Sequence, residues 1–178
     1  TNYAGHFLIE AQKNGNLISD YMLQQWKKFQ RGKTNGWAPS TTNFYGGDLS
    51  QAYRLFTLAL AKVPELGAMN RLKEFKYLSP EAKWRLAAAY KLTGQDNAAL
   101  DLISGLAVSF TNRPSPGITF GSDLRDQAMV LETLTIMGKR AEAAELLPAI
   151  AAKLSQDNWY STQTTAYALI AIAKYCGK

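Results

Sequence analysis

The sequence has very little of the side-chain chemistry that most enzymes and metal sites use. It contains one cysteine, Cys176, and one histidine, His6. A single cysteine excludes an internal disulfide framework. One cysteine and one histidine are also too few for a typical zinc site. No apolar run approaches the roughly 18–20 residues that a membrane-spanning helix needs. No glycine-rich loop follows a strand pattern, so phosphate and dinucleotide binding find no support.

What is present is typical of a globular protein. Of the 178 residues, 47% are hydrophobic and 19% are charged, which is enough apolar material for one buried core. We therefore predict a single domain over residues 1–178. The net charge of +6 comes from scattered residues rather than a basic run, which disfavours nucleic-acid binding. The opening letters TNYAGHFLIEAQ already have a helical pattern, and this suggests that the sequence begins inside a longer protein.

Helical patterns follow one another along the chain, and strand patterns are nearly absent. The predicted helices cover residues 2–13, 18–31, 49–62, 65–76, 80–92, 95–107, 122–137, 139–155 and 161–175. The residues expected to cap helix N-termini are Asp48, Ser79, Ser122 and Ser161, with Pro80 in a first turn. The glycines expected to end helices are Gly15, Gly94 and Gly138.

From residue 49 onward the predicted helices alternate between two kinds. One kind is apolar around most of its circumference, in the segments 49–61, 81–92, 124–137 and 164–175. The other kind has a single apolar stripe, formed by Ala98, Ala99, Leu102, Ile103 and Leu106 in one helix and by Ala143, Leu147, Ile150 and Leu154 in another. Opposite the second stripe lie Arg140, Glu142, Glu145 and Lys153, which we expect to face solvent. The alternation predicts two layers, with inner helices covered by outer ones.

Two all-α architectures have such layers: an open solenoid of helix pairs and a closed α/α toroid. The inner helices begin at uneven intervals, which disagrees with the fixed tetratricopeptide period of about 34 residues. They are also too apolar for the polar concave groove of a solenoid. We therefore predict an α/α toroid with alternating inner and outer helices. A full ring of six hairpins needs roughly 250 residues, so this chain is expected to form a partial ring.

Two segments rich in glycine, proline, serine and asparagine interrupt the helices, at 30–48 and 109–123. They contain the aromatic residues Trp37, Phe44, Tyr45, Phe110 and Phe120. Long loops in compact domains are often functional. Large apolar rings rarely remain uncovered, however, so we favour a role in fastening the loops to helix ends.

No group of residues predicts catalysis. Cys176 has no histidine near it in sequence, and a lone cysteine in an apolar helix is more often a small core residue than a nucleophile. Asp123 and Asp126 around Arg125 suit the positive N-terminal end of a helix. Glu142 and Glu145 belong to a solvated face. The sequence therefore predicts no catalytic residue, no metal site and no cofactor.

Toroids are also the fold of terpene cyclases and prenyltransferase subunits, which keeps a terpenoid-handling enzyme as an alternative. Such enzymes need acidic clusters or a zinc site, and neither DxDD nor DDxxD occurs here. The segment QRGKTNGW is only loosely similar to the Gln-to-Trp motif of cyclases, and it occurs once. A helical-repeat module that binds protein partners is the other alternative.

Five segments, taken in order, resemble the later part of the thioester-type domain of bacterial alpha-2-macroglobulins, the Bacteroidetes-like members above all. They are TNYAGHFLIEAQKNG, LSQAYRLFTLALAKVPELGAMNRLKE, LSPEAKWRLAAAYKLTGQDNAALDLI, FGSDLRDQAMVLETLTIMGKRAEA and NWYSTQTTAYALIAIAKY. Together they cover essentially the whole chain. The most specific is the Trp-x-Ser-Thr-Gln segment at Trp159 with the apolar helix after it.

The resemblance implies a segment of a large periplasmic, cell-surface or secreted protein that traps proteases. Its partners would be the rest of the parent chain and, through that parent, target proteases, with no nucleic acid and no membrane insertion by this segment. The family's thioester forms in a Cys-x-Glu-Gln motif, which this chain lacks, since Cys176 is followed by Gly177 and Lys178. The resemblance therefore implies a non-catalytic scaffold.

Overall fold

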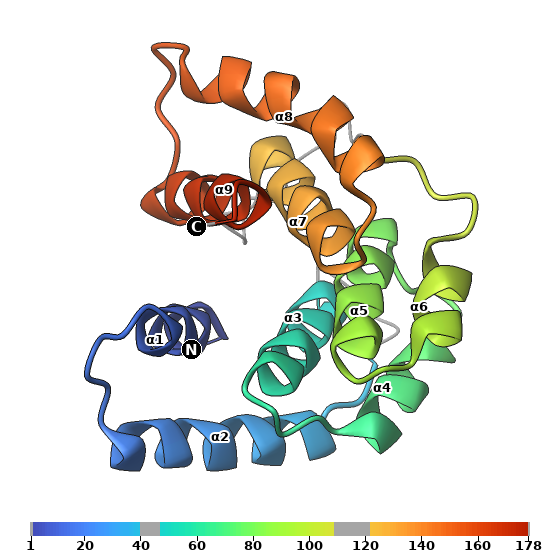
Figure 1. Ribbon diagram of the computed structural model, residues 1–178. Helices are drawn as coiled ribbons and strands as arrows, with labels where there is room; N and C mark the ends of the chain where they lie inside the picture. The colour runs from blue at the N-terminus through green and yellow to red at the C-terminus, as the bar shows by residue number, and fades with distance from the viewer. Residues whose placement is uncertain (1, 40–46, 109–121, 178) are drawn as a thin grey trace. The chain divides into compact units, whose positions relative to one another are not determined.

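The computed structural model describes residues 2–39, 47–108 and 122–177, and these are helical with connecting turns (Figure 1). The helices are α1 (Asn2–Lys13), α2 (Asp20–Asn35), α3 (Gly47–Leu60), α4 (Leu66–Lys73), α5 (Pro80–Leu92), α6 (Asp96–Ile103), α7 (Asp123–Ile136), α8 (Arg140–Leu154) and α9 (Thr162–Tyr175). The described residues contain no strand. The all-α prediction is thus confirmed. The chain divides into two compact units, Thr1–Leu102 and Ile103–Lys178, which are described in turn. A single domain over 1–178 stays a prediction.

The core of unit 1 is the pair α3 and α5, which lie side by side (Figure 1). Helices α1 and α2 pack against α3, and α4 contacts both members of the pair. In α5 the five consecutive residues from Leu86 to Tyr90 are all buried. Five consecutive residues point in every direction around a helix, so α5 is covered on all sides. The inner-helix prediction is confirmed for this segment.

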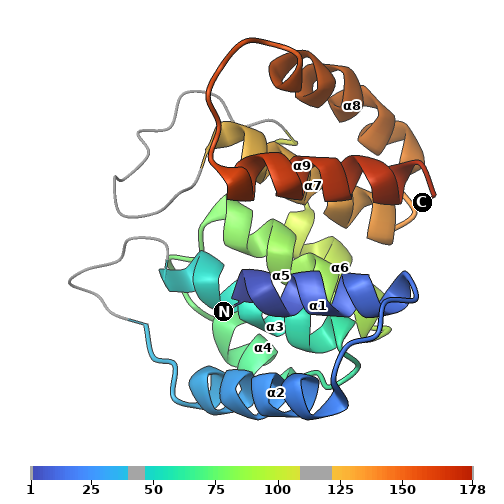
Figure 2. The same ribbon diagram turned by 90° about the vertical axis from the view of Figure 1, so that its left-hand side faces the viewer.

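In unit 2, α7 is the inner helix, and α8 and α9 both pack against it (Figure 2). Every residue of α7 from Asp126 to Leu134 is buried. Helix α8 continues through Pro148 and buries one stripe, Ala143, Leu146 and Ile150. The striped outer helix is therefore confirmed, with Leu146 rather than Leu147 at its centre.

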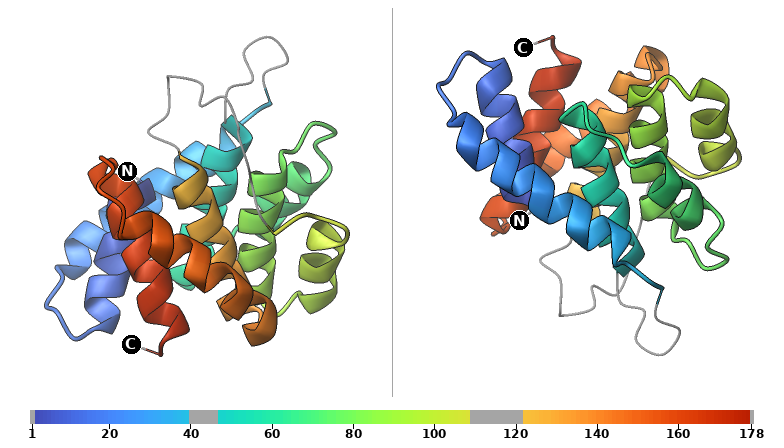
Figure 3. Two further views of the ribbon diagram at one scale, coloured as in Figure 1. Left: turned by 90° about the horizontal axis from the view of Figure 1, so that it is seen from above. Right: turned by 90° about the horizontal axis from the view of Figure 1, so that it is seen from below.

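Helix α9 is less enclosed than expected, because its fully buried residues share one face and most of the others are half-buried. The residues buried in α9 are Thr164, Tyr167, Ala168 and Ala171, which share one face. On another face Leu169 is 55% exposed. Helices α7 and α8 both approach α9 (Figure 3), but the described residues of unit 2 provide no third neighbour. Apolar residues around the circumference of α9 would permit burial on every side, but they do not show how many neighbouring helices cover it.

Three of the four predicted N-caps are confirmed. The side chains of Ser79, Ser122 and Ser161 accept hydrogen bonds from the backbone N–H three residues ahead, at 3.3, 3.2 and 3.2 Å. The prediction for Asp48 is wrong, because α3 already begins at Gly47. Asp48 instead accepts a hydrogen bond from the backbone N–H of Ser79 at 2.7 Å, which joins the first turn of α3 to the start of α5.

The hairpins α5–α6 and α7–α8 turn in the same way. Gly94 and Gly138 both have positive φ, 75° and 76°, which glycine adopts without the steric cost of a Cβ. The residue after each glycine donates its N–H back to the preceding helix, Gln95 to Tyr90 at 3.0 Å and Lys139 to Leu134 at 2.9 Å. These are the bonds of a Schellman-type helix end. The repeated hairpin expected from the sequence is confirmed.

Helix α2 extends further than predicted. It continues to Asn35 rather than ending near residue 31, because Gln30 and Thr34 are buried and hold the last turn against the unit. Residues 30–35 are therefore helix, not loop. Beyond it, Trp37 meets Phe75 edge-to-face, with ring centroids 6.2 Å apart, as expected for an aromatic that fastens a loop. Phe44, Tyr45, Phe110 and Phe120 lie outside the described residues.

We expect Gly5→Ala to destabilise the protein by about 2 kcal/mol, although alanine is the better helix former. Gly5 lies where α1 meets α2, and a Cβ there would overlap the indole ring of Trp26. Gly32, on the outer side of α2, is the matched control because a Cβ there meets nothing within 4 Å. Gly32→Ala should stabilise by about 0.5–1 kcal/mol. Thermal and guanidinium unfolding measure both, and equal stabilisation would contradict the close approach.

We expect ionisation of Tyr90 to lower the stability of the protein at high pH. Burial, together with the negative charge of Glu74, raises the pKa of Tyr90 to about 12. Its hydroxyl donates to Asn70 at 2.7 Å, linking α5 to α4. A raised folded-state pKa means that this stabilisation is complete below about pH 10 and is lost as the pH approaches 12. Unfolding free energies measured from pH 9 to 12 should fall less steeply in Tyr90→Phe than in the parent protein.

Candidate functional site

Among the described residues of unit 2, the most enclosed charged group is the carboxylate of Glu132, on the inner helix α7. Its side chain is fully buried. One oxygen accepts a hydrogen bond from the ammonium of Lys174 at 2.6 Å, and the other accepts one from the hydroxyl of Tyr167. Both partners come from α9. This arrangement is a buried ion pair with a hydrogen-bonded phenol, which fixes α9 on α7.

The chemistry open to Glu132 is limited by its burial. A general base must direct a free lone pair at a substrate proton. Here the carboxylate side chain is fully buried, its two oxygens accept hydrogen bonds from α9, and the ammonium of Lys174 balances the charge. The arrangement suits a structural role in joining two helices.

Unit 1 has a second buried polar group, built around His6 on α1. The histidine is 1% exposed, and its Nδ1 lies 2.9 Å from the hydroxyl of Tyr53. Its Nε2 lies 3.5 Å from a carboxylate oxygen of Glu10. The ring also meets Phe56 edge-to-face at 5.5 Å. With both ring nitrogens engaged, His6 is a hydrogen-bonded residue of α1.

Arg85 completes this cluster from α5. Its guanidinium carbon lies 4.2 Å from the ring centroid of Phe56 and 5.6 Å from that of Tyr53, and the side chain is fully buried. A desolvated guanidinium over an aromatic face is stabilised by the ring quadrupole. Four side chains from α1, α3 and α5 therefore form one packed cluster, His6, Tyr53, Phe56 and Arg85.

A polar network links α2 to α3. Arg54 donates to the side-chain oxygen of Gln30 at 3.0 Å and also to Gln51, which in turn donates to the backbone oxygen of Thr34 at 3.3 Å. Burial lowers the pKa of Arg54. The network satisfies part of the polar face of α2, and it explains why that helix continues through Thr34.

Cys176 belongs to unit 2 and His6 to unit 1. Cys176 is exposed and caps the end of α9, where its N–H donates to Ile172 at 2.9 Å. His6 belongs to unit 1 and is engaged there by Tyr53 and Glu10. Cys176 is therefore not buried as a lone cysteine in an apolar helix usually is, because it lies at the exposed C-terminal end of α9.

Two further carboxylates, on α7 and α8, are engaged by neighbouring residues. Asp126 accepts from Arg125 at 2.8 Å in the first turn of α7, consistent with the favourable N-terminal charge expected there. Glu142 pairs with Lys139 at 2.7 Å, and this hydrogen bond lowers the pKa of Glu142. Lys153 was expected to face solvent but is half-buried and donates to Gln127 at 3.2 Å.

Among the described residues, no three His, Cys, Asp or Glu side chains come close enough together to hold a metal ion. Over the same ranges, no helix is both long and apolar enough to cross a membrane. That no residue of this chain is catalytic or binds a cofactor stays a prediction.

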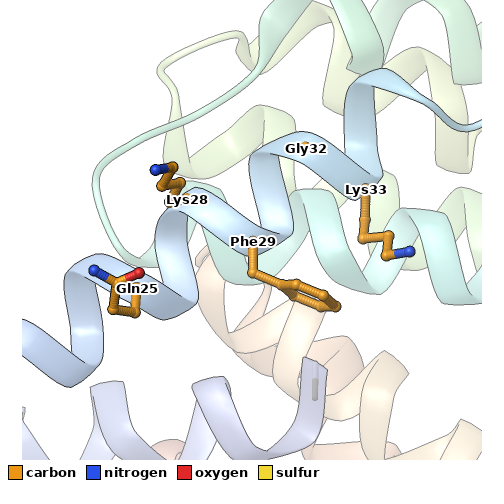
Figure 4. A pocket seen from close by; sticks show the side chains of 5 residues that line it. All are labelled: Gln25, Lys28, Phe29, Gly32 and Lys33. Atoms are coloured by element: carbon orange, nitrogen blue, oxygen red, sulfur yellow. The ribbon is translucent and has the colours of Figure 1, made fainter.

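The outer side of α2 carries a shallow hollow of about 430 Å³, lined by Gln25, Lys28, Phe29, Gly32 and Lys33 (Figure 4). All five residues come from this one helix. Phe29 and Lys33 project to the same side, and the ammonium of Lys33 lies 5.6 Å from the centroid of the Phe29 ring. The sequence did not predict this feature, because Gly32 and Lys33 were expected to lie in a loop rather than on the helix that carries Gln25, Lys28 and Phe29.

No family model matches the sequence, and no curated protein is similar enough to count as a relative. Solved structures of bacterial alpha-2-macroglobulins, however, have the same fold. The native Escherichia coli protein matches 97% of this chain at 22% identity and a TM-score of 0.79, and the methylamine-reacted Salmonella protein matches 97% at 21% identity and 0.79. An Escherichia coli structure running from domain MG7 to the C-terminus matches 98% at 22% identity and 0.78.

These matches cover almost all of this chain but only part of the others. The chain spans 12% of the first two proteins and 29% of the third. The expected resemblance is therefore confirmed at the level of the fold. The third match places the shared fold within the C-terminal portion of that protein.

Proposed function

We propose that this chain is a non-catalytic helical scaffold segment of a bacterial alpha-2-macroglobulin-like protease inhibitor. The observation that supports it most is the TM-score of 0.79 over 97% of the chain. The collinear sequence resemblance is independent support. In this proposal the parent protein traps the protease, works in the periplasm or at the cell surface, and supplies any thioester from residues outside this chain.

The structure's polar groups are consistent with a scaffold role. Glu132, Arg85 and Arg54 are all engaged in contacts between helices of one unit. Such contacts hold inner and outer helices in register. None of these groups has the arrangement of nucleophile, base and orienting acid that acyl transfer needs.

The proposal is tested by incubating the chain with proteases of different specificity, such as trypsin and elastase. We expect neither a covalent adduct in denaturing gels and mass spectra nor any inhibition of peptide hydrolysis. An adduct involving a residue of this chain would contradict the scaffold role. Cys176→Ser is the control, because it removes the one thiol without touching a helix core.

A terpenoid-handling enzyme is the remaining catalytic alternative, and no observation favours it. Calorimetric titration with farnesyl diphosphate and magnesium separates the two readings. The scaffold proposal expects no heat beyond dilution. Saturable binding would favour the enzyme instead.

A further inference from the structure

Helix α2 exposes more apolar surface than a solvent-facing helix needs. On its outer side Tyr21 is 75%, Met22 51% and Phe29 47% exposed. The same helix carries four basic residues, Lys27, Lys28, Arg31 and Lys33, against the single acidic residue Asp20. Its opposite side buries Leu23, Gln30 and Thr34 in unit 1. The helix therefore has an inner face that packs and an outer face that is both apolar and positively charged.

Gly32 lies at the centre of this outer face and has no structural reason to be glycine. Its φ is not in the left-handed region, and a Cβ built there meets nothing within 4 Å. Glycine inside a helix costs stability relative to alanine. A bare backbone at this point leaves the hollow between Lys28, Phe29 and Lys33 open, so that another chain can approach closely.

We propose that the outer face of α2, formed by Tyr21, Met22, Gln25, Lys28, Phe29, Gly32 and Lys33, binds an acidic protein segment that carries an apolar anchor. The anchor would occupy the hollow over Gly32 beside the Phe29 ring. Carboxylates on either side of it would pair with Lys28 and Lys33. The proposal does not depend on the proposed function, because it rests on the surface of α2 alone.

The charge decides between possible occupants. A symmetric contact between the α2 faces of two copies would bring like charges together, which disfavours that pairing. An anionic membrane also attracts lysines, so binding to lipid vesicles is measured as a separate outcome of the test below. An acidic protein segment satisfies both the charge and the shape.

The test begins with a library of 16-residue helical peptides displayed on phage and selected against the intact chain. We expect the selected peptides to carry Asp or Glu on both sides of a Leu, Ile or Phe. In NMR titrations the strongest synthetic peptide should shift the amide signals of residues 25–33. Selection of basic or neutral peptides, or of no peptide at all, would overturn the proposal. Amide shifts confined to other helices would overturn it as well.

Two pairs of variants locate the site on α2. The double variant Phe29→Ala with Lys33→Glu should lower the affinity for the peptide at least tenfold. Its control is Tyr77→Ala with Lys76→Glu, which removes another exposed lysine–aromatic pair, with Nζ 5.5 Å from the ring, and should change the affinity less than twofold. Circular dichroism confirms that both variants fold. Equal losses in the two would overturn the assignment.

The glycine provides a readout that a stability effect cannot imitate. Gly32→Ala should raise the melting temperature of the protein and yet lower its affinity for the peptide at least threefold. Gly67→Ala, on the exposed side of α4 with nothing within 4 Å of a Cβ, should leave the affinity unchanged. Unchanged peptide affinity in Gly32→Ala would contradict the close approach.

A separate experiment measures binding to vesicles of one part anionic to three parts neutral lipid. If the chain bound these vesicles but no peptide, and the Phe29–Lys33 variant lost vesicle binding, the face would be assigned to membranes instead.

Discussion

Replacing Glu132 with leucine is expected to destabilise unit 2 by about 3 kcal/mol or more, one of the two largest effects that we predict. The fully buried carboxylate balances the ammonium of Lys174, whose side chain is only 18% exposed. Removing one partner of a buried pair leaves the other charge desolvated without compensation. It also removes the acceptor of the Tyr167 hydroxyl, an additional penalty for a buried donor.

Guanidinium unfolding and hydrogen exchange of the α7 and α9 amides measure this effect. Glu132→Gln keeps an acceptor for Tyr167 but loses the charge, so its cost should be smaller than that of leucine. A double-mutant cycle with Lys174→Met isolates the ion pair. The control is Glu145→Leu on the exposed side of α8, which should stay within about 0.5 kcal/mol of the parent. A similar small change for Glu132→Leu would show that the pair contributes little.

The second large effect is expected for Phe56→Ala in α3, a loss of about 4 kcal/mol of unfolding free energy. The ring is fully buried, and truncating a buried phenylalanine loses its transfer free energy and leaves a cavity. It also removes the aromatic face beneath the guanidinium of Arg85, 4.2 Å from its centroid. Against the 5–15 kcal/mol total that is typical of domains, such a loss leaves unit 1 marginal.

Phe56→Leu separates the two contributions, because leucine keeps most of the volume but has no π face. We expect it to cost about 1–2 kcal/mol, and the coupling with Arg85→Met should measure the cation–π part. Phe29→Ala, the same change on the outer face of α2, should shift the unfolding free energy by less than about 0.5 kcal/mol. If chemical denaturation showed equal losses for Phe56→Ala and Phe29→Ala, the burial of the Phe56 cluster would be contradicted.

The helices could be predicted from the sequence because their signals are local. Ser79, Ser122 and Ser161 cap the predicted starts, and Gly94 and Gly138 end the predicted hairpin helices. A cap and its target N–H are three residues apart, so the neighbouring letters contain the whole interaction. Asp48 was misassigned for the opposite reason. Its partner is the N–H of Ser79, which only the packing of α3 against α5 brings within reach.

The polar clusters could not be predicted as clusters. Glu132 was not singled out from the sequence, and its partners Tyr167 and Lys174 lie 35 and 42 residues away. The same holds for His6 with Tyr53, which are 47 residues apart. A charged residue in an apolar helix indicates that a partner exists, but it does not identify that partner.

The sequence by itself determined the all-α class, the two kinds of helix and most of the caps, because each depends on spacings of a few residues. Only the tertiary structure decided which buried charges meet, that a single face of α9 is fully buried, and that α2 turns an apolar, basic face outward. These features depend on which helix surfaces come together. That choice is made by the packing of segments distant in sequence, where burial of apolar area outweighs local preference.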